Sequence, residues 1–387
     1  MAAGESLMLE QLANFTEAHR DAMVNLTMRL VAIATENPPG HHYRDCAELL
    51  CAELQRLGFA ETRMEGDCVL SFVGTGERTL YFHGHYDVVP AHSRAQFEPH
   101  VTGANLFGRG SSDMKSGLAA MIYAAKAVRD SGLELDGRIG LVFVPDEETA
   151  GARGSRHLLE RGMLGAGGVG MLMPEPTGGV VWNGNRGAIT VRATVRGKTA
   201  HVGRQHEGVN AFEKAIPVMQ RVLDLKREVE AHGSILMMGG RSEGGANFNA
   251  VPDWFSFTLD RRINPGESIE YEKERLLAAL KDGDAKVEVE VFQEGSSCSV
   301  SGESALGRAL SHSVERVTKK PAQFEMCPGL LEIRFYAERG IPAFAYGPGL
   351  LTVSHGPNEF VPIDRIVASA TVYALTAAEI LRKSTRV

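Results

Sequence analysis

Residues 79–87 have the sequence TLYFHGHYD, in which an apolar run passes directly into histidine and aspartate. Two later apolar runs end in the same way: IGLVFV at 139–144 precedes PDEE, and VGMLM at 169–173 precedes PEP. In an open, mostly parallel sheet the carboxyl ends of the strands share one edge, and ligands gather at that edge. The sequence therefore predicts an α/β fold with a mixed, mostly parallel sheet flanked by helices.

The order of the predicted elements indicates two domains. Helices are predicted early in the chain at 8–34, 44–57 and 115–129. From about residue 187 the pattern changes to that of a split strand-helix-strand sandwich, with strands at 189–195, 235–238, 254–263 and 285–292 and helices at 209–228 and 268–280. We therefore expect an inserted, ferredoxin-like α+β domain at 187–293 between two parts of a catalytic domain, 1–186 and 294–387.

The composition is that of a globular protein. Its 387 residues are 43% hydrophobic, which allows a sizeable core, and a net charge of −7 without a basic block argues against nucleic-acid binding. No apolar run approaches the roughly 20 residues that span a bilayer, and the start lacks the features of a secretory signal. We expect a cytoplasmic protein without a membrane partner. Five scattered cysteines without a Cys-x-x-Cys pair argue against a disulfide framework or a thiolate zinc site.

The first candidate site residues follow the strand at 79–82 and a glycine-rich turn. His85 could bind a metal ion while Asp87 orients its other ring nitrogen, the alternative being a hydrogen-bonded loop histidine. His83, two residues earlier, is left out of the site. Asp113 follows the turn GRGSS at 108–112, whose glycines allow close approach of a ligand. Asp113 could instead be a helix N-cap.

Three further carboxylates and a second histidine complete the candidate set. Glu147 and Glu148 follow the strand at 139–144, so one could bind metal while its neighbour takes a proton. Glu175 lies between two prolines after the next strand, and His355 lies in the late loop SHGPNE. Imidazole and carboxylate donors without a thiolate suit zinc, with cobalt or manganese as alternatives.

The order of these motifs resembles the dinuclear zinc family that contains aminoacylase, carboxypeptidase G, acetylornithine deacetylase and succinyl-diaminopimelate desuccinylase. The resemblance covers nearly the whole chain and implies hydrolysis of an amide bond with two metal ions. It implies that Asp113 bridges both ions, with His85 and Glu175 on one ion and Glu148 and His355 on the other.

The same resemblance implies the remaining roles. Glu147 becomes the general base, and Asp87 orients the first histidine ligand. The inserted domain is expected to act as a lid, to form a homodimer and to supply His201, Asn247 and Arg262 for substrate binding. A histidine and an asparagine can stabilise a developing oxyanion, and an arginine can clamp a substrate carboxylate.

The segment MCPGLLEIRF at 326–335 departs from the family pattern, which places a Gly-Gly-Thr-like, Asp-containing loop before Arg-Phe. Arg334 still fits a carboxylate-binding role. Proline and leucine make the surrounding wall more apolar, which alters the acyl or amine group that fits. His206 and Arg261 are expected to be ordinary surface residues.

The predicted reaction is hydrolysis of an N-acyl amino acid or a related amide. Alternatives are a dipeptidase or carboxypeptidase of the same family, a deaminase-like hydrolase of a non-peptide amine, and a metal-binding protein that has lost catalysis. The presence of both Glu147 and Asp87 argues against the last alternative, although fold alone does not establish activity.

Overall fold

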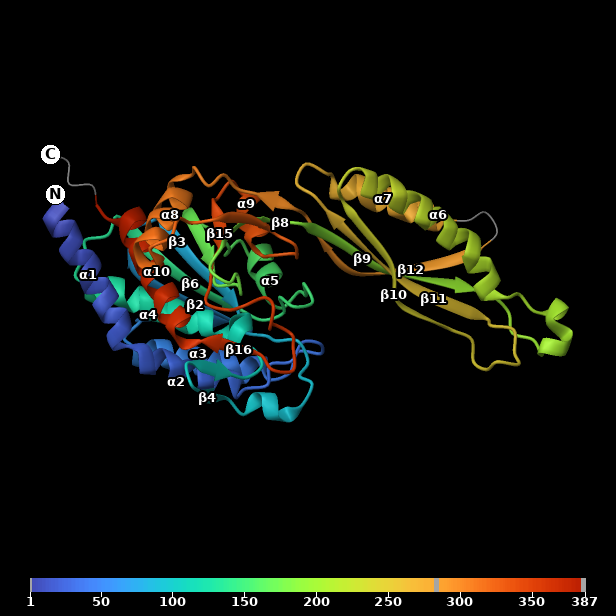
Figure 1. The fold of residues 1–387 in the computed structure, drawn as a ribbon, viewed down its shortest axis with the longest axis horizontal. Helices are drawn as coiled ribbons and strands as arrows, with labels where there is room; N and C mark the ends of the chain where they lie inside the picture. The colour runs from blue at the N-terminus through green and yellow to red at the C-terminus, as the bar shows by residue number, and fades with distance from the viewer. Residues whose placement is uncertain (1, 282–284, 384–387) are drawn as a thin grey trace. The chain divides into compact units, whose positions relative to one another are not determined.

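The computed structural model describes residues 2–281 and 285–383, which form two compact units (Figure 1). Taken over the described residues, the first unit comprises Met1–Gly184, Ser299–Met326 and Glu332–Val387, and the second comprises Asn185–Cys298 and Cys327–Leu331. The limits expected for the inserted domain, 187 and 293, fall inside the second unit. Its roles as lid and dimerisation domain stay predictions.

The first unit is built around a sheet in the order β1-β2-β6-β3-β7-β15-β8-β13, with β14 paired to β8. Four central strands, β6, β3, β7 and β15, run parallel to one another. Strand β2 pairs antiparallel with β6, and strand β8 pairs antiparallel with β15. The strands are β1 (Glu61–Glu65), β2 (Cys68–Thr75), β3 (Thr79–His85), β6 (Gly137–Val144), β7 (Gly168–Met173), β8 (Val181–Asn185), β13 (Cys298–Ser299), β14 (Phe324–Cys327) and β15 (Ala343–Ala345). The predicted α/β fold with a mostly parallel sheet is confirmed.

Helices flank this sheet, and a small sheet of β4 (His100–Thr102), β5 (Asn105–Phe107) and β16 (Phe360–Pro362) lies beside it. The alanine-rich helix α4 is buried along most of its length and packs on β3, β6 and α10 (Figure 1). The helices of the unit are α1 (Ala2–Ala18), α2 (Arg20–Val31), α3 (Tyr43–Arg56), α4 (Ser116–Asp130), α5 (Ser155–Glu160), α8 (Ala305–Thr318), α9 (Ile333–Ala337) and α10 (Ile363–Leu381).

The helical segment expected at 8–34 is two helices, because the chain leaves helical geometry at His19. The backbone there has φ −104° and ψ 14°, and the imidazole Nδ1 lies 2.8 Å from the carbonyl oxygen of Phe15. A side chain that bonds the preceding turn competes with continuation of the helix. The single helix expected from the apolar spacing is therefore wrong at this position.

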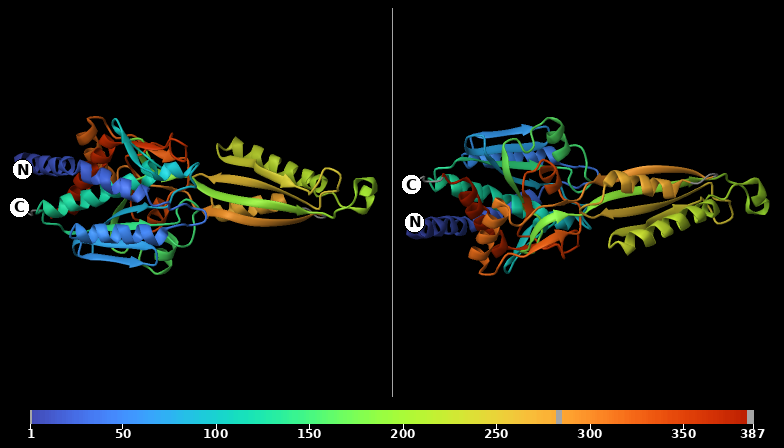
Figure 2. Two further views of the ribbon diagram at one scale, coloured as in Figure 1. Left: turned by 90° about the horizontal axis from the view of Figure 1, so that it is seen from below. Right: turned by 90° about the horizontal axis from the view of Figure 1, so that it is seen from above.

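The second unit is an antiparallel sheet in the order β10-β11-β9-β12, with α6 and α7 on one face (Figure 2). The elements are β9 (Gly187–Arg196), α6 (Ala211–Ala231), β10 (Ile235–Gly244), β11 (Trp254–Ile263), α7 (Ile269–Leu280) and β12 (Lys286–Gly295). Alternate residues of β9 and β11 point into a core shared with both helices. This order of strands and helices confirms the predicted ferredoxin-like arrangement.

Arg261 was expected at the surface, and this expectation is wrong. Its side chain is 1% exposed and lies in the second unit between β11 and α7. Its guanidinium donates to Glu272 at 2.7 Å and to Glu267 at 2.5 Å. Two carboxylates offset the cost of burying this charge. His206 is exposed, as expected.

None of the helices among the described residues is both long enough and apolar enough to cross a membrane.

Candidate metal centre

Four of the predicted site residues lie at the carboxyl ends of three adjacent parallel strands, β6, β3 and β7, at one edge of the sheet. His85 is the last residue of β3 and pairs in register with Val144, the last residue of β6. Glu147 and Glu148 follow β6, and Glu175 follows β7 on the other side of β3. Parallel strands place their carboxyl ends together, so residues far apart in sequence meet here.

Asp113 reaches the same edge from the loop before α4. Its backbone is not helical (φ −124°, ψ 96°), and the residue at the N-cap of α4 is Lys115. The N-cap alternative for Asp113 therefore does not hold. Gly110, with φ 85°, adopts a left-handed conformation that a glycine tolerates in this turn.

The side chain of Glu359 holds this loop in place. Its Oε1 accepts hydrogen bonds from the backbone N–H of Gly110, Ser112 and Asp113 at 3.0, 3.0 and 3.1 Å. Arg109 donates to Glu359 Oε2 at 2.5 Å and to the carbonyl oxygen of His355 at 3.2 Å. These contacts fix the positions of Asp113 and His355 relative to each other. Glu359 is the last residue of the loop SHGPNE, and no role was predicted for it.

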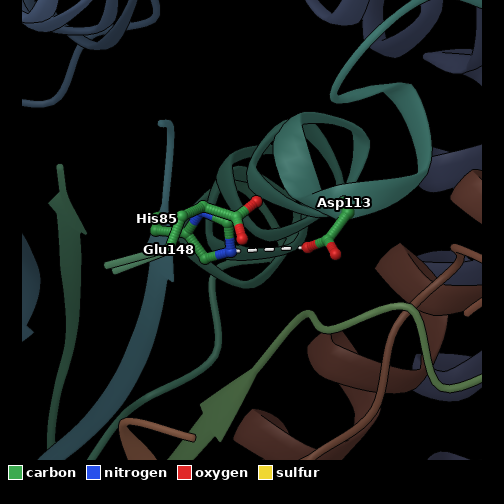
Figure 3. Close-up of side chains that lie close together, drawn as sticks. All are labelled: His85, Asp113 and Glu148. Atoms are coloured by element: carbon green, nitrogen blue, oxygen red, sulfur yellow. Dashed lines mark ion pairs between the residues drawn. The ribbon is translucent and has the colours of Figure 1, made fainter. Parts of the chain in front are cut away.

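The two oxygens of Asp113 face two different imidazoles. Oδ1 lies 3.4 Å from His85 Nε2, and Oδ2 lies 3.4 Å from His355 Nε2. His355 Nε2 is also 3.3 Å from Glu148 Oε2. His85, Asp113 and Glu148 each offer a ligand atom within 4.8 Å of the others, and Figure 3 shows the three side chains converging. This is the arrangement expected when one carboxylate lies between two cation positions.

Asp87 organises the loop that carries the two glutamates. Its carboxylate accepts hydrogen bonds from the backbone N–H of Glu147 at 3.2 Å and of Glu148 at 3.1 Å, and from Asn37 Nδ2 at 2.8 Å. Its Oδ1 lies 3.4 Å from His85 Nδ1, which also lies 3.0 Å from the carbonyl oxygen of Asp87. Asp87 therefore sets both the orientation of the imidazole and the position of the glutamates. The part of Asn37 in this network was not predicted.

The carboxylates at this edge are buried close to one another, with His85 and His355 beside them. Burial raises the pKa of Glu147, Glu148 and Glu175 above the usual value, and neighbouring carboxylates raise it further. Among the described residues, Asp113 Oδ1, Glu148 Oε1 and Glu175 Oε1 are buried without a hydrogen-bond partner. The carboxylates of Asp113 and Glu148, which accept hydrogen bonds from the imidazole, raise the pKa of His355 to about 10. Unpartnered oxygens and nearby imidazoles fit a divalent cation such as zinc.

Metal-free protein is expected to lose thermal stability as the pH rises above the usual glutamate pKa of 4.5. The folded pKa of Glu147 and of Glu175 lies well above the usual 4.5. The stability that they contribute is fully present below about 4.5 and is lost as the pH rises through the folded pKa. Calorimetric Tm values with chelator measure this fall, and zinc-loaded protein should show a smaller one. A metal-free Tm that rises over this range contradicts the expectation.

Arg334 lies in α9 and is 3% exposed, with its guanidinium carbon 4.2 Å from the ring centre of Phe335. Two residues earlier, Glu332 Oε2 lies 2.8 Å from His83 Nε2, and Ser155 Oγ is 3.0 Å from the same nitrogen. His83 was left out of the site, and it belongs to this separate buried network. The charge of Glu332 nevertheless contributes to the raised pKa of Glu147 after burial itself.

The three predicted substrate-binding residues of the inserted domain lie in the second unit. His201 accepts a hydrogen bond at Nδ1 from Gly203 N at 3.1 Å. Asn247 Oδ1 accepts from Phe248 N at 2.8 Å. Arg262 pairs with both oxygens of Asp260, at 2.6 and 3.1 Å. Their roles toward a substrate stay predictions.

The α/β fold and this donor set are those of a metal-dependent hydrolase that acts on amide or peptide bonds. The chain belongs to peptidase family M20/M25/M40, whose family model matches residues 81–379. This match includes every residue of the candidate metal centre.

Solved structures with low sequence identity share the fold. The di-peptidase Dug1p from Saccharomyces cerevisiae is 16% identical with a TM-score of 0.78, over 96% of this chain and 98% of that chain. The M20 family metallo-carboxypeptidase Sso-CP2 from Sulfolobus solfataricus is 18% identical with a TM-score of 0.77, over 93% and 99%. The Bacillus subtilis YXEP protein, a dinuclear metal binding peptidase from the M20 family, is 15% identical with a TM-score of 0.64, over 94% and 99%.

Proposed function

We propose that this protein hydrolyses the amide bond of an N-acyl amino acid or a closely related amide at a centre of two divalent metal ions. The observation that carries the proposal is the position of Asp113, whose two oxygens face His85 on one side and His355 on the other. Asp113 would bridge the ions, His85 and Glu175 would hold one, and Glu148 and His355 would hold the other. Zinc suits these donors, with cobalt or manganese as alternatives.

The residues around the centre supply the remaining chemistry. When bound, the two ions lower the pKa of a water molecule and polarise the scissile carbonyl. Glu147 Oε2 lies 3.9 Å from His85 Nε2, and its side chain is 12% exposed. Glu147 would take the proton of the attacking water and pass it to the departing amine. Asp87 keeps the His85 ring oriented during this cycle.

Substrate contacts are proposed for four residues outside the metal centre. His201 and Asn247 would stabilise the oxyanion that develops on the carbonyl oxygen. Arg262 and Arg334 would bind the substrate carboxylate. Each role is one that the resemblance to the family implies, and single alanine variants that raise KM without loss of metal would support it.

A dipeptidase or carboxypeptidase is the second candidate function. It is favoured by the names of structural neighbours, which include a di-peptidase, a metallo-carboxypeptidase and human carnosine dipeptidase 1. The decisive experiment is a panel of N-acyl amino acids, dipeptides and aromatic amides, with products identified by mass. Turnover of N-acyl amino acids above that of dipeptides supports the proposal. The reverse order selects the second candidate, and release of ammonia selects a deaminase-like hydrolase.

We also propose that the second unit forms a homodimer through β10 and α6. β10 is an edge strand, and the large side chains Ile235 and Met237 on it are 43% and 50% exposed. Helix α6 packs beside β10 and exposes Phe212 and Ile216. An unpaired strand edge flanked by apolar side chains is suited to pair with a second copy.

Met237→Glu is expected to convert the dimer into a monomer, because it places a charge on that edge. The control is Val291→Glu on β12, the opposite edge of the same sheet, where Val291 is 42% exposed. Light scattering after size exclusion gives the mass of each variant. A Met237→Glu protein that stays dimeric, or a monomeric wild type, contradicts the proposed interface.

A further inference from the structure

A cavity of about 550 Å³ lies in the first unit, and none of the five proposed metal ligands lines it. Helices α8 and α10 form two of its walls, and the loop at 318–323 forms a third. Its floor consists of Gly178–Gly179 after β7 and Tyr346–Gly347 after β15. Its volume falls in the range of small-molecule sites, roughly 300–1,000 Å³.

The charged residues that line the cavity are both cations. They are Arg365 and Lys320, and no acidic residue is part of the lining. Neither of these two cations has an ion-pair partner within residues 2–281 and 285–383. Asp364, the acid next to Arg365, pairs with Arg20 instead, at 2.5 Å. An uncompensated positive charge in a concave site attracts anions.

Arg365 reaches across the cavity to its floor. A Cβ atom added to Gly179 would lie 3.5 Å from Arg365 Nη1. The charge of Arg365 also acts on the Tyr346 hydroxyl: burial raises the pKa of Tyr346 to about 12, and Arg365 opposes this rise. The Arg365 guanidinium can donate paired hydrogen bonds to an oxyanion bound over this floor.

The floor is in direct contact with the backbone of Glu175. Gly347 N donates to Thr177 Oγ1 at 3.2 Å, and Thr177 N donates to the Glu175 carbonyl at 2.7 Å. A Cβ atom added to Gly347 would lie 2.3 Å from that same carbonyl oxygen, so only glycine allows this approach. An occupant of the cavity would therefore lie against Gly347, which contacts the segment that carries Glu175.

We propose that this cavity binds a small organic anion, a carboxylate or a phosphate ester, with Arg365 and Lys320 as its cationic contacts. The anion site does not depend on the proposed metal ligands, because all its contacts lie outside that set. Because Gly347 of its floor contacts the Glu175 segment, the cavity is a second site through which an anion in solution can act on the metal centre.

The test is isothermal titration of the metal-loaded protein with succinate and with inorganic phosphate at constant ionic strength. Saturable binding of either probe is expected, and Arg365→Gln should weaken it about tenfold or more because it removes a charge-assisted hydrogen bond. Arg316→Gln is the matched control: Arg316 lies on α8 and does not line the cavity. It should bind like the wild type. Stronger binding of succinate than of phosphate identifies a carboxylate site, and the reverse identifies a phosphate site.

Two further variants test the anion site separately from the folding of Arg365→Gln and from the metal centre. Lys320→Gln, at an exposed loop position, should also weaken binding and serves if Arg365→Gln fails to fold. Asp113→Asn, which is expected to lose metal, should keep the anion site, so a failure of the metal assignment is distinguishable from a failure of this proposal. Equal affinity in wild type and both cavity variants, no saturable binding, or binding that disappears in Asp113→Asn alone overturns it.

Discussion

Replacing Glu147 with glutamine is expected to lower kcat by about 10²–10⁴-fold while leaving the bound metal unchanged. Glu147 lies beside the centre, with its Oε2 3.9 Å from His85 Nε2, and it is proposed as the base and not as a metal ligand. Glutamine has the same shape as glutamate and cannot accept the proton of the attacking water. Steady-state kinetics with the best substrate of the panel, together with elemental analysis, measure both quantities.

The control is Asp146→Asn, which removes the adjacent negative charge. Asp146 accepts hydrogen bonds from Asn37 and Tyr43 at 3.3 Å and is not a proposed base. We expect a much smaller change in kcat for this variant. Near wild-type kcat in Glu147→Gln removes Glu147 from the mechanism, and loss of metal in that variant would make it a ligand instead.

Asp113→Asn is expected to lose most of its bound metal and, with it, nearly all turnover. The carboxylate presents one oxygen toward each imidazole, whereas an amide has only one oxygen and presents N–H donors on the other side. Both proposed ions depend on this residue, so their affinities should fall together. Elemental analysis after dialysis gives the metal content per chain.

Single-ligand variants provide the comparison for this result. His85→Ala and His355→Ala each remove one proposed ligand of one ion, so each should retain more metal than Asp113→Asn. Asp130→Asn, at the end of α4 and paired with Lys126 at the surface, should have wild-type metal content and activity. An Asp113→Asn protein with wild-type metal content contradicts the bridging role.

The site residues that follow strands could be predicted from local sequence. Apolar runs indicate the strands, and the polar residues after them indicate where each strand ends. His85, Glu147, Glu148 and Glu175 follow from this rule together with the geometry of a parallel sheet. His355 could not be placed in this way. It lies in a loop more than 240 residues from Asp113 in sequence, and only the resemblance to a family connected the two.

Contacts between distant segments account for most of what was not predicted. Glu359 accepts hydrogen bonds from the loop of Asp113 across 246 to 249 residues, and no local pattern indicates such a pair. The burial of Arg261 could not be predicted from the sequence around it. Its partners Glu267 and Glu272 come close to it only when α7 packs on the sheet. The edge strand β1 was missed because ETRME offers little apolar periodicity.

The most direct measurement is anomalous diffraction at the zinc edge from crystals of the zinc-loaded protein. We predict two peaks per chain on either side of the Asp113 carboxylate, one next to His85 and Glu175 and one next to Glu148 and His355. A single ion, or ions bound without Asp113, would contradict the proposal of a two-metal hydrolase.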